Sequence, residues 1–240
     1  MRKISVLPLF FILAVTIGCS KRATAPQPIE KQTLQRDSSD NTIYALTCEG
    51  TGDSALVYLT VPYEGQDPDT LNILEARRNR QVFGRPHVGD MVAIVRNDSN
   101  AIVADRVIVT EELCGQWSYT VYPTLRRHFP SDTLPKRLRE LLEQPREYSM
   151  VIKKDYVMYC LGPRRQPSDD MSPVVYPPLR HFTQWNIYNG RLLFTETARD
   201  TTDSNNILSV DTAELVKLRH DTLVLRFSDG EHSYYRKVKK

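Results

Sequence analysis

Short runs rich in β-branched and aromatic residues recur along this chain, and polar turn residues separate them. In the first part of the chain such runs cover residues 43–48, 54–61 and 91–95. The polar segment 97–100 follows the third run and leads into further apolar residues, which is the pattern of a β-hairpin. We expect strands at these runs and one short helix over residues 69–80, where the helical period is weak.

The same alternation continues from Leu113 to the end of the chain. The strands predicted there cover residues 117–121, 148–153, 156–161, 184–187, 191–195, 207–218, 222–227 and 233–238. Asn189 and Gly190 separate two of these runs, and this dipeptide between apolar segments is a strong signal for a two-residue hairpin. Leucines recur at helical spacing between residues 134 and 142, which predicts a helix over residues 135–143.

Many short strands with regular turns favour closed or nearly closed barrels, because closure leaves no exposed strand edge. We therefore predict a mainly β fold made of two small barrel-like modules, with one or two short helices. Val88-Gly89-Asp90 opens a hairpin in a short strand-rich unit, and this unit, residues 42–112, resembles an OB-fold module. Residues 113–240 resemble a lipocalin-like meander barrel, since Gly115-Gln116-Trp117 is similar to the Gly-x-Trp that opens lipocalins.

Further positions resemble the downstream hairpins of lipocalin-like Bacteroidetes lipoproteins, namely Trp185, Asn189-Gly190 and residues 222–225. The pairing of the two module types is similar to that in stress-sensing lipoproteins of the NlpE family, with the order reversed. The Cys-x-x-Cys motif of that family is absent from this sequence. The resemblance therefore transfers no metal or redox role, and we expect neither a metal site nor a cofactor.

The first 18 residues have the parts of a secretory signal. Arg2 and Lys3 precede an apolar run over residues 4–17, which is too short for a transmembrane helix. The segment Thr16-Ile17-Gly18-Cys19 resembles the lipobox of bacterial lipoproteins, although a leucine is usual at the first of these positions. The resemblance implies cleavage before Cys19 and acylation of this cysteine with palmitate-like chains. Two or three such chains would anchor the protein in a membrane of the cell envelope.

The segment that follows, residues 19–41, is polar and contains prolines without periodic apolar positions, so it is predicted to be a disordered tether. It begins without an acidic run, which favours the periplasmic face of a Gram-negative envelope.

Removal of Arg2 and Lys3 with the signal lowers the net charge from +3 to +1. This charge is too small to indicate binding to nucleic acid. We interpret the scattered basic doublets as solvated surface or, alternatively, as contacts for lipid headgroups. These doublets are Arg77-Arg78, Arg126-Arg127, Arg164-Arg165 and Lys239-Lys240.

Three cysteines remain after Cys19. An exported compartment permits disulfides. Cys48 ends the first predicted strand and Cys114 follows the last strand of the first module, so a Cys48–Cys114 disulfide is possible and would staple that module; free thiols are the alternative. Cys160 lies on an apolar strand and is interpreted as a buried thiol, because no Cys/His signature marks a nucleophile.

The five histidines lack metal-ligand spacing, and the sequence contains neither a Gly-x-Ser-x-Gly motif nor a glycine-rich phosphate loop. Aromatic residues form the remaining cluster, around the Pro-rich segment 162–178. It is either a filled barrel core closed by this segment or an apolar ligand pocket at the barrel mouth, with two arginines placed for an anionic headgroup. The candidate pocket residues are Tyr156, Tyr159, Tyr176, Arg180, Trp185 and Arg191.

These observations favour a membrane-anchored, non-catalytic lipoprotein that binds or scaffolds an envelope protein or an apolar ligand. The alternative is an envelope enzyme or inhibitor that acts on cell-wall or glycan substrates. A convergent set of polar side chains inside the second barrel would favour that alternative. Nucleic-acid binding through the OB-like module fits neither the compartment nor the charge.

Overall fold

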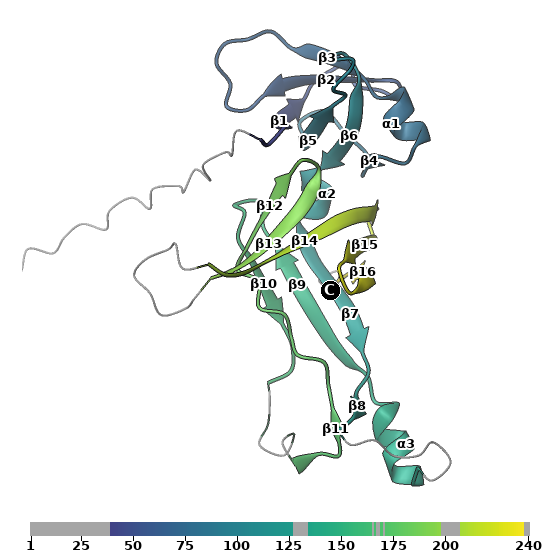
Figure 1. The fold of residues 1–240 in the computed structure, drawn as a ribbon. Coiled ribbons are helices and arrows are strands. Elements are labelled where there is room, and N and C mark those ends of the chain that lie inside the picture. Colours follow the sequence, from purple (N-terminus) through teal and green to yellow (C-terminus); the bar gives the residue numbers. More distant parts are fainter. Residues whose placement is uncertain are drawn as a thin grey trace, which may run out of the picture. The chain divides into compact units, whose positions relative to one another are not determined.

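The computed structural model describes residues 39–126, 134–164, 166, 169, 171–197 and 207–237. Ser38–Lys240 form one compact unit by their internal contacts. The described part is mainly β with three short helices, and the predicted fold class of two barrel-like β modules is confirmed (Figure 1). Among the described residues, no helix is both long enough and apolar enough to cross a bilayer.

The first module is a six-stranded sheet with the strand order β3-β2-β1-β5-β6-β4. Its elements are β1 (Thr42–Thr47), β2 (Ala55–Thr60), β3 (Asp69–Asn72), α1 (Leu74–Arg78), β4 (Val82–Phe83), β5 (Met91–Arg96) and β6 (Ala104–Val109). Neighbouring strands are antiparallel except β4 and β6, which are parallel. A parallel bridge from Asn72 to Val103 joins the end of β3 to the start of β6. This contact closes the sheet into an OB-like barrel.

Residues 69–72 form a strand and not the first turn of the predicted helix. Leu71 lies opposite Leu56 of β2, and its side chain is fully buried in the core of the first module. Burial within the sheet therefore outweighs the weak helical period of this segment. The helix that remains, α1, begins only at Leu74.

The second module is an eight-stranded sheet with the order β10-β9-β7-β16-β15-β14-β13-β12. Its strands are β7 (Gly115–Val121), β9 (Arg146–Ile152), β10 (Met158–Leu161), β12 (Gln184–Tyr188), β13 (Arg191–Thr197), β14 (Ile207–Leu218), β15 (Thr222–Phe227) and β16 (Gly230–Arg236). The last strand pairs with the first through Tyr235 and Ser118. A bridge between Val157 and Gln184 connects β10 to β12. The sheet is therefore an up-and-down meander that closes almost completely, as in a lipocalin-like barrel.

The predicted hairpin at Asn189-Gly190 is confirmed. Both residues have positive φ angles, 47° and 72°, as the tight turn between β12 and β13 requires. The turn also contacts the first module, because the Arg106 Nη1 atom donates a hydrogen bond of 2.8 Å to the Gly190 carbonyl oxygen.

Packed aromatic and aliphatic side chains fill the interior of the second module. The Phe194 ring lies 5.2 Å from the Phe182 ring and 5.7 Å from the Phe227 ring. Tyr119 contacts Tyr234 edge-on at 5.1 Å, and burial raises the pKa of Tyr119 to about 12. This arrangement corresponds to the filled-core interpretation of the aromatic cluster.

One hydrophobic cluster extends from the first module into the second. Phe83, Ala93 and Ile108 of the first sheet belong to the same cluster as Trp117 of β7. Leu113, at the end of α2 (Thr110–Leu113), is fully buried in it. The predicted division between residues 112 and 113 therefore falls within a helix whose last residue packs into the shared cluster.

Smaller elements extend beyond the second barrel (Figure 1). The predicted leucine-rich helix is confirmed as α3 (Lys136–Leu142), none of whose residues is fully buried. The short strands β8 (Thr124–Leu125) and β11 (Val174–Val175) pair with each other, and β11 lies within the Pro-rich segment 162–178.

The end of the predicted tether is held by the β12–β13 turn. Asn189 N donates to Asp40 Oδ1 at 3.0 Å, Asn41 N donates to Asn189 Oδ1 at 2.8 Å, and Asn189 Nδ2 donates to the Ser39 carbonyl at 3.0 Å. Residues 39–41 are thus part of the folded unit and not of a free tether. The signal segment 1–18, Cys19 and the remainder of the predicted tether lie outside the described residues.

Candidate functional site

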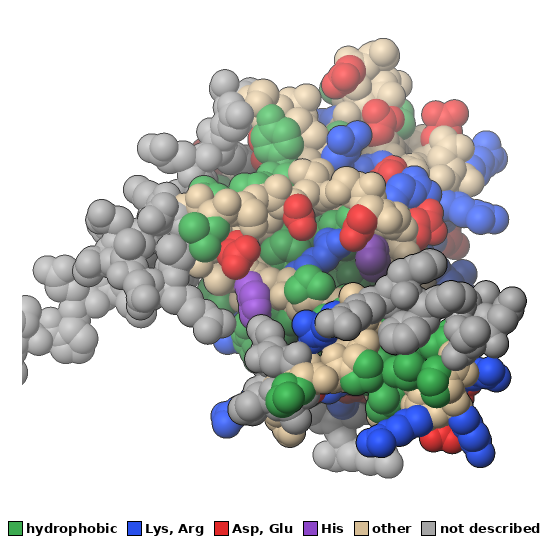
Figure 2. All heavy atoms as spheres, turned by 60° about the horizontal axis from the view of Figure 1, so that its bottom comes forward, with side chains coloured by type: hydrophobic (Ala, Val, Ile, Leu, Met, Phe, Trp, Pro, Cys, Tyr) green, Lys and Arg blue, Asp and Glu red, His purple; other side chains and the backbone are tan. Residues whose placement is uncertain are grey.

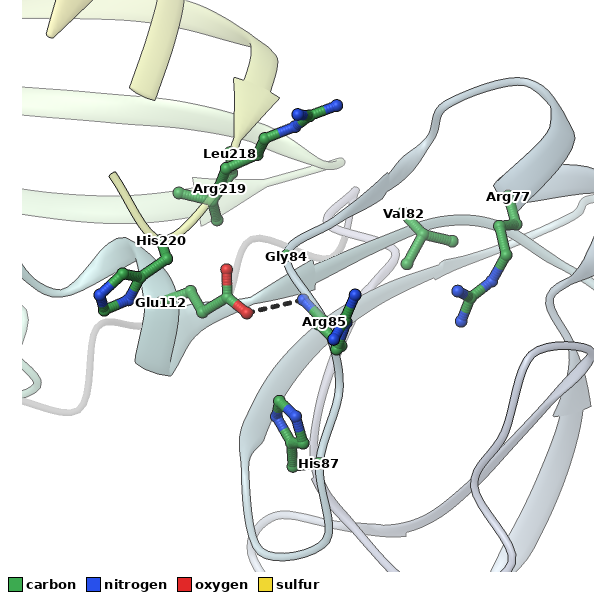
Figure 3. A pocket seen from close by; sticks show the side chains of 9 residues that line it. All are labelled: Arg77, Val82, Gly84, Arg85, His87, Glu112, Leu218, Arg219 and His220. Carbon is green, nitrogen blue, oxygen red and sulfur yellow. Dashed lines mark hydrogen bonds between the residues drawn. The ribbon is translucent and has the colours of Figure 1, made fainter. Parts of the chain in front are cut away.

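A cavity of ≈ 750 Å³ opens between the α1–β4 region of the first module and the β14–β15 turn of the second (Figure 3). Five of its nine lining residues are arginines or histidines, and one is acidic. The lining residues are Arg77, Val82, Gly84, Arg85, His87, Glu112, Leu218, Arg219 and His220.

A second cavity of ≈ 660 Å³ shares Arg77, Val82, Leu218 and Arg219 with the first. The shared residues make the two cavities one continuous depression, which we call the cationic groove. Its basic residues are Arg77, Arg80, Arg85, His87, Lys217, Arg219 and His220. Half-buried valines from both modules, at positions 82, 216 and 224, give the second cavity an apolar lining.

The end of α1 brings two of these arginines to the groove. The chain reverses after the helix at Arg80, which has a φ of 58°. The Gln81 N–H then donates to the Ala76 carbonyl at 2.7 Å, and the Gln81 carbonyl accepts a hydrogen bond of 3.0 Å from the Val107 N–H on β6. This reversal carries the chain from Arg77 to β4 and fixes both at the groove.

Gly84 allows the next basic residue to approach α2. Its φ is 86°, and a Cβ atom at this position would lie 2.9 Å from Val109 Cβ and 3.1 Å from Glu112 Cδ. The Arg85 N–H donates a hydrogen bond of 2.7 Å to Glu112 Oε1, as Figure 3 shows. Only glycine permits both the left-handed backbone and this close approach.

The β14–β15 turn supplies the other wall. Arg219 and Thr222 exchange backbone hydrogen bonds of 2.8 and 3.3 Å across the turn. Leu218 is buried, whereas Arg219 and His220 are exposed. Arg236 on β16 donates to the His220 carbonyl. The two exposed side chains therefore project from a backbone that is fixed on both sides.

The acidic residues of the groove already have partners. Glu112 accepts the Arg85 backbone hydrogen bond, and Glu231 Oε1 lies 2.6 Å from Arg226 Nη2. Asp53, whose side chain is almost fully exposed, pairs with Arg77 at 3.1 Å.

Four basic side chains of the groove have no ion pair with any other described residue. These side chains are Arg80, Arg85, Lys217 and Arg219. On the face shown in Figure 2, acidic and basic side chains are interspersed. The groove therefore has a positive potential that attracts anions.

The groove offers recognition chemistry for anions. Arginine donates paired hydrogen bonds to carboxylate and phosphate oxygens, and such charge-assisted bonds are stronger than neutral ones. In the described part of the chain, no group of three or more His, Cys, Asp or Glu side chains is arranged to hold a metal ion.

The structure does not bring the six predicted pocket residues into one cavity. Tyr156 and Trp185 do come together, with ring centroids 5.4 Å apart. Tyr159 is 40% exposed and lies under Lys153 at 5.3 Å. Tyr176 stacks with the Arg146 guanidinium at 3.8 Å, at the periphery of the barrel.

The two predicted arginines also separate. Arg180 lies over the Phe227 ring at 4.4 Å and pairs with Asp229. Arg191 is exposed on β13, where it pairs in register with Tyr188. The six residues therefore lie in separate surroundings, and their joint role as a ligand pocket stays a prediction.

The Cys48–Cys114 disulfide is not formed, and Cys48, Cys114 and Cys160 are free thiols. Cys48 follows β1, where its N–H donates to the Val57 carbonyl at 2.8 Å within the first module. Cys114 instead packs against the hydrophobic cluster that extends through both modules. The sequence predicts that both cysteines belong to one module, whereas only Cys114 packs against the shared cluster, and the Cys48 thiol instead contacts the Leu46 carbonyl oxygen at 3.7 Å. Cys160 also packs against that cluster, and burial raises the pKa of its thiol.

The groove is not evident from the local sequence. Its basic residues come from two segments more than a hundred positions apart, and no motif links these segments. The Arg77-Arg78 doublet was the only signal, and it was interpreted as solvated surface or as a contact for lipid headgroups. Comparison of the chain with known protein families, with curated proteins and with solved structures finds no match.

Proposed function

We propose that this protein is a membrane-anchored envelope lipoprotein whose two β modules together form a non-catalytic binding site for an anionic ligand. The observation that carries the proposal is the convergence of Arg80, Arg85, Lys217 and Arg219 on one groove without ion pairs among the described residues. Like charges held close together repel one another. An anionic ligand would remove this repulsion and satisfy the guanidinium groups.

The ligand that fits best carries carboxylate or phosphate groups beside an apolar portion. Val82, Val216 and Val224 line the second cavity, so they would contact the apolar portion while the arginines contact the charged groups. This ligand class includes acidic segments of an envelope protein and anionic amphiphiles. Acylation at Cys19 would keep the groove near a membrane where such ligands occur.

The test removes two charges that have no partner and compares the result with a matched loss of charge elsewhere. Binding of dextran sulfate, with neutral dextran as the control polymer, is measured by calorimetry at several salt concentrations. The variant Arg85→Gln/Arg219→Gln should bind dextran sulfate at least about tenfold more weakly and with a weaker salt dependence, because two charge-assisted contacts are lost.

The control variant Lys136→Gln/Arg137→Gln loses the same net charge from the exposed helix α3, away from the groove residues. It should bind the polyanion almost as tightly as the unmodified protein. Equal weakening in both variants would show that only net charge matters and would refute the groove as the binding site.

A further inference from the structure

A small aromatic pocket lies at the junction of the two modules and takes no part in the cationic groove. Its volume is ≈ 60 Å³. Three aromatic rings line it, those of Tyr44, Tyr156 and Trp185, together with the side chains of Glu111 and Lys154. A water molecule needs only about 10–15 Å³ of such volume. The pocket can therefore admit a group several times larger than one water.

The surrounding structure holds the three rings in place. Tyr156 lies 6.2 Å from Tyr44 edge-on and 5.4 Å from Trp185. The Tyr44 hydroxyl donates to Asn186 Oδ1 at 2.8 Å, and Trp185 Nε1 donates to the Lys153 carbonyl at 2.8 Å. The rings thus form a preorganised wall.

Tyr156 adopts an unusual backbone conformation at this pocket. Its φ is 62°, which is uncommon for a bulky residue and is costly unless the surrounding structure holds it. The Tyr156 carbonyl accepts a hydrogen bond of 2.9 Å from the Trp185 N–H. The strained residue is thereby fixed beside the other ring of the pocket.

The charge of the pocket comes from Glu111. Its side chain is 24% exposed and pairs with the Lys154 ammonium group, whose side chain is 71% exposed. Cys114 also lines the pocket. Burial raises the pKa of the Cys114 thiol to about 11, and the charge of Glu111 adds to this effect. The thiol is therefore neutral near pH 7, and Glu111 is the anionic group of the pocket.

We propose that this pocket binds an organic ammonium group, with Glu111 as its counter-ion and with Tyr44, Tyr156 and Trp185 as its aromatic wall. Ring faces attract ammonium and methylated ammonium groups, and enclosure by several rings strengthens the attraction. Lys154 supplies the ammonium group that pairs with Glu111 in the free protein. A ligand ammonium would displace this exposed lysine and make the ring contacts as well.

The test is a fluorescence titration of the whole mature protein with tetramethylammonium and with ethylammonium, using sodium chloride at equal ionic strength as the control. The chain has two tryptophans, and Trp117 is buried in the shared cluster. Titration of the variant Trp117→Phe assigns the signal to Trp185. Where that variant folds poorly, the shift of the Trp185 indole N–H resonance in the unmodified protein serves instead.

We expect substitutions of Glu111 and Lys154 to change the affinity for ammonium in opposite directions. Glu111→Gln should weaken ammonium binding at least about tenfold, because the counter-ion is lost. Lys154→Ala should strengthen binding severalfold, because the internal competitor is removed. Lys153→Ala, which removes a neighbouring lysine that lies over Tyr159, should leave binding unchanged.

Two outcomes would overturn the proposal. The first is a Trp185 signal that responds no more to ammonium salts than to sodium chloride. The second is weaker binding in Lys154→Ala, which would show that the ion pair only supports the fold. Neither outcome bears on polyanion binding, which is measured at a different set of residues.

Discussion

Arginine side chains have opposite surroundings in two regions of this protein. In the cationic groove, Arg85 and Arg219 have no ion pair with another described residue. On the second module, the Arg180 guanidinium covers the Phe227 ring, pairs with Asp229 and lies 3.6 Å from Asp211. We call this second region the Arg180 cluster. Of these two regions, the groove is the one that contains arginines without an ion pair to another described residue.

This difference distinguishes an arginine that stabilises the fold from an arginine that is available to bind a ligand. A ligand at the Arg180 cluster would have to displace Asp229, whose other oxygen lies 3.0 Å from His232 Nε2. A ligand at Arg85 or Arg219 would break no ion pair with another described residue. The comparison therefore predicts that substitutions in the cluster affect stability and that substitutions of groove arginines affect binding.

We expect the largest effect on stability from a substitution of Gly84, which lines the groove. Gly84→Ala should lower the free energy of unfolding by about 2–4 kcal/mol, because the new Cβ would need a left-handed backbone and would crowd Val109 and Glu112. It should also weaken polyanion binding, because the hydrogen bond from the Arg85 N–H to Glu112 would be disturbed. Urea unfolding and calorimetry measure the two effects.

Gly65 provides a matched control for the free-energy cost of placing alanine in a left-handed backbone. Its φ of 87° is nearly the same, but a Cβ there would meet no atom within 4 Å. Gly65→Ala should cost about 1 kcal/mol and leave polyanion binding unchanged. Equal losses in the two variants would mean that crowding at the groove contributes nothing.

An intermediate effect is expected at the Arg180 cluster. Arg180→Met keeps the bulk over the Phe227 ring and removes the charge that pairs with Asp229. The variant should lose up to about 1 kcal/mol of unfolding free energy, because the half-exposed ion pair with Asp229 and the weaker one with Asp211 are lost together. Its affinity for dextran sulfate should stay within about twofold of that of the unmodified protein. A large loss of affinity with unchanged stability would reverse the comparison.

Local chemistry in the sequence predicts much of the fold. The Asn189-Gly190 turn follows from the need for two positive φ angles, and the long apolar run over residues 207–218 coincides with β14. The strand at residues 69–72 could not be predicted in this way. Leu71 is in a strand because it packs opposite Leu56, and this pairing partner is not evident from the local sequence.

The site was less predictable than the fold for a related reason. Within the aromatic cluster of the sequence, the rings of Tyr156 and Trp185 lie together. Tyr159 points outward, because its neighbour Met158 is buried on the other face of β10. Recognising the groove requires knowing that Arg85 and Arg219 line the same cavity and that neither forms an ion pair with another described residue. Neither property is local in sequence.

The smallest expected effect is the acid dependence of the Arg180 cluster. Burial opposes ionisation of Asp229, but hydrogen bonds from His232 and Arg180 outweigh it, so the pKa of this carboxyl lies below its usual value. The ion pair therefore stabilises the fold fully above the unfolded-state pKa of about 4 and loses this contribution as the pH falls through the lower folded-state value. Because the carboxylate is half exposed, the contribution should not exceed about 0.5 kcal/mol.

Urea unfolding should show Asp229→Asn slightly less stable than the unmodified protein at pH 7, with the difference vanishing near pH 2. The exposed turn variant Asp98→Asn should show no such convergence, and a difference for Asp229→Asn that persists in acid would mean that packing, and not charge, holds the Arg180 cluster together.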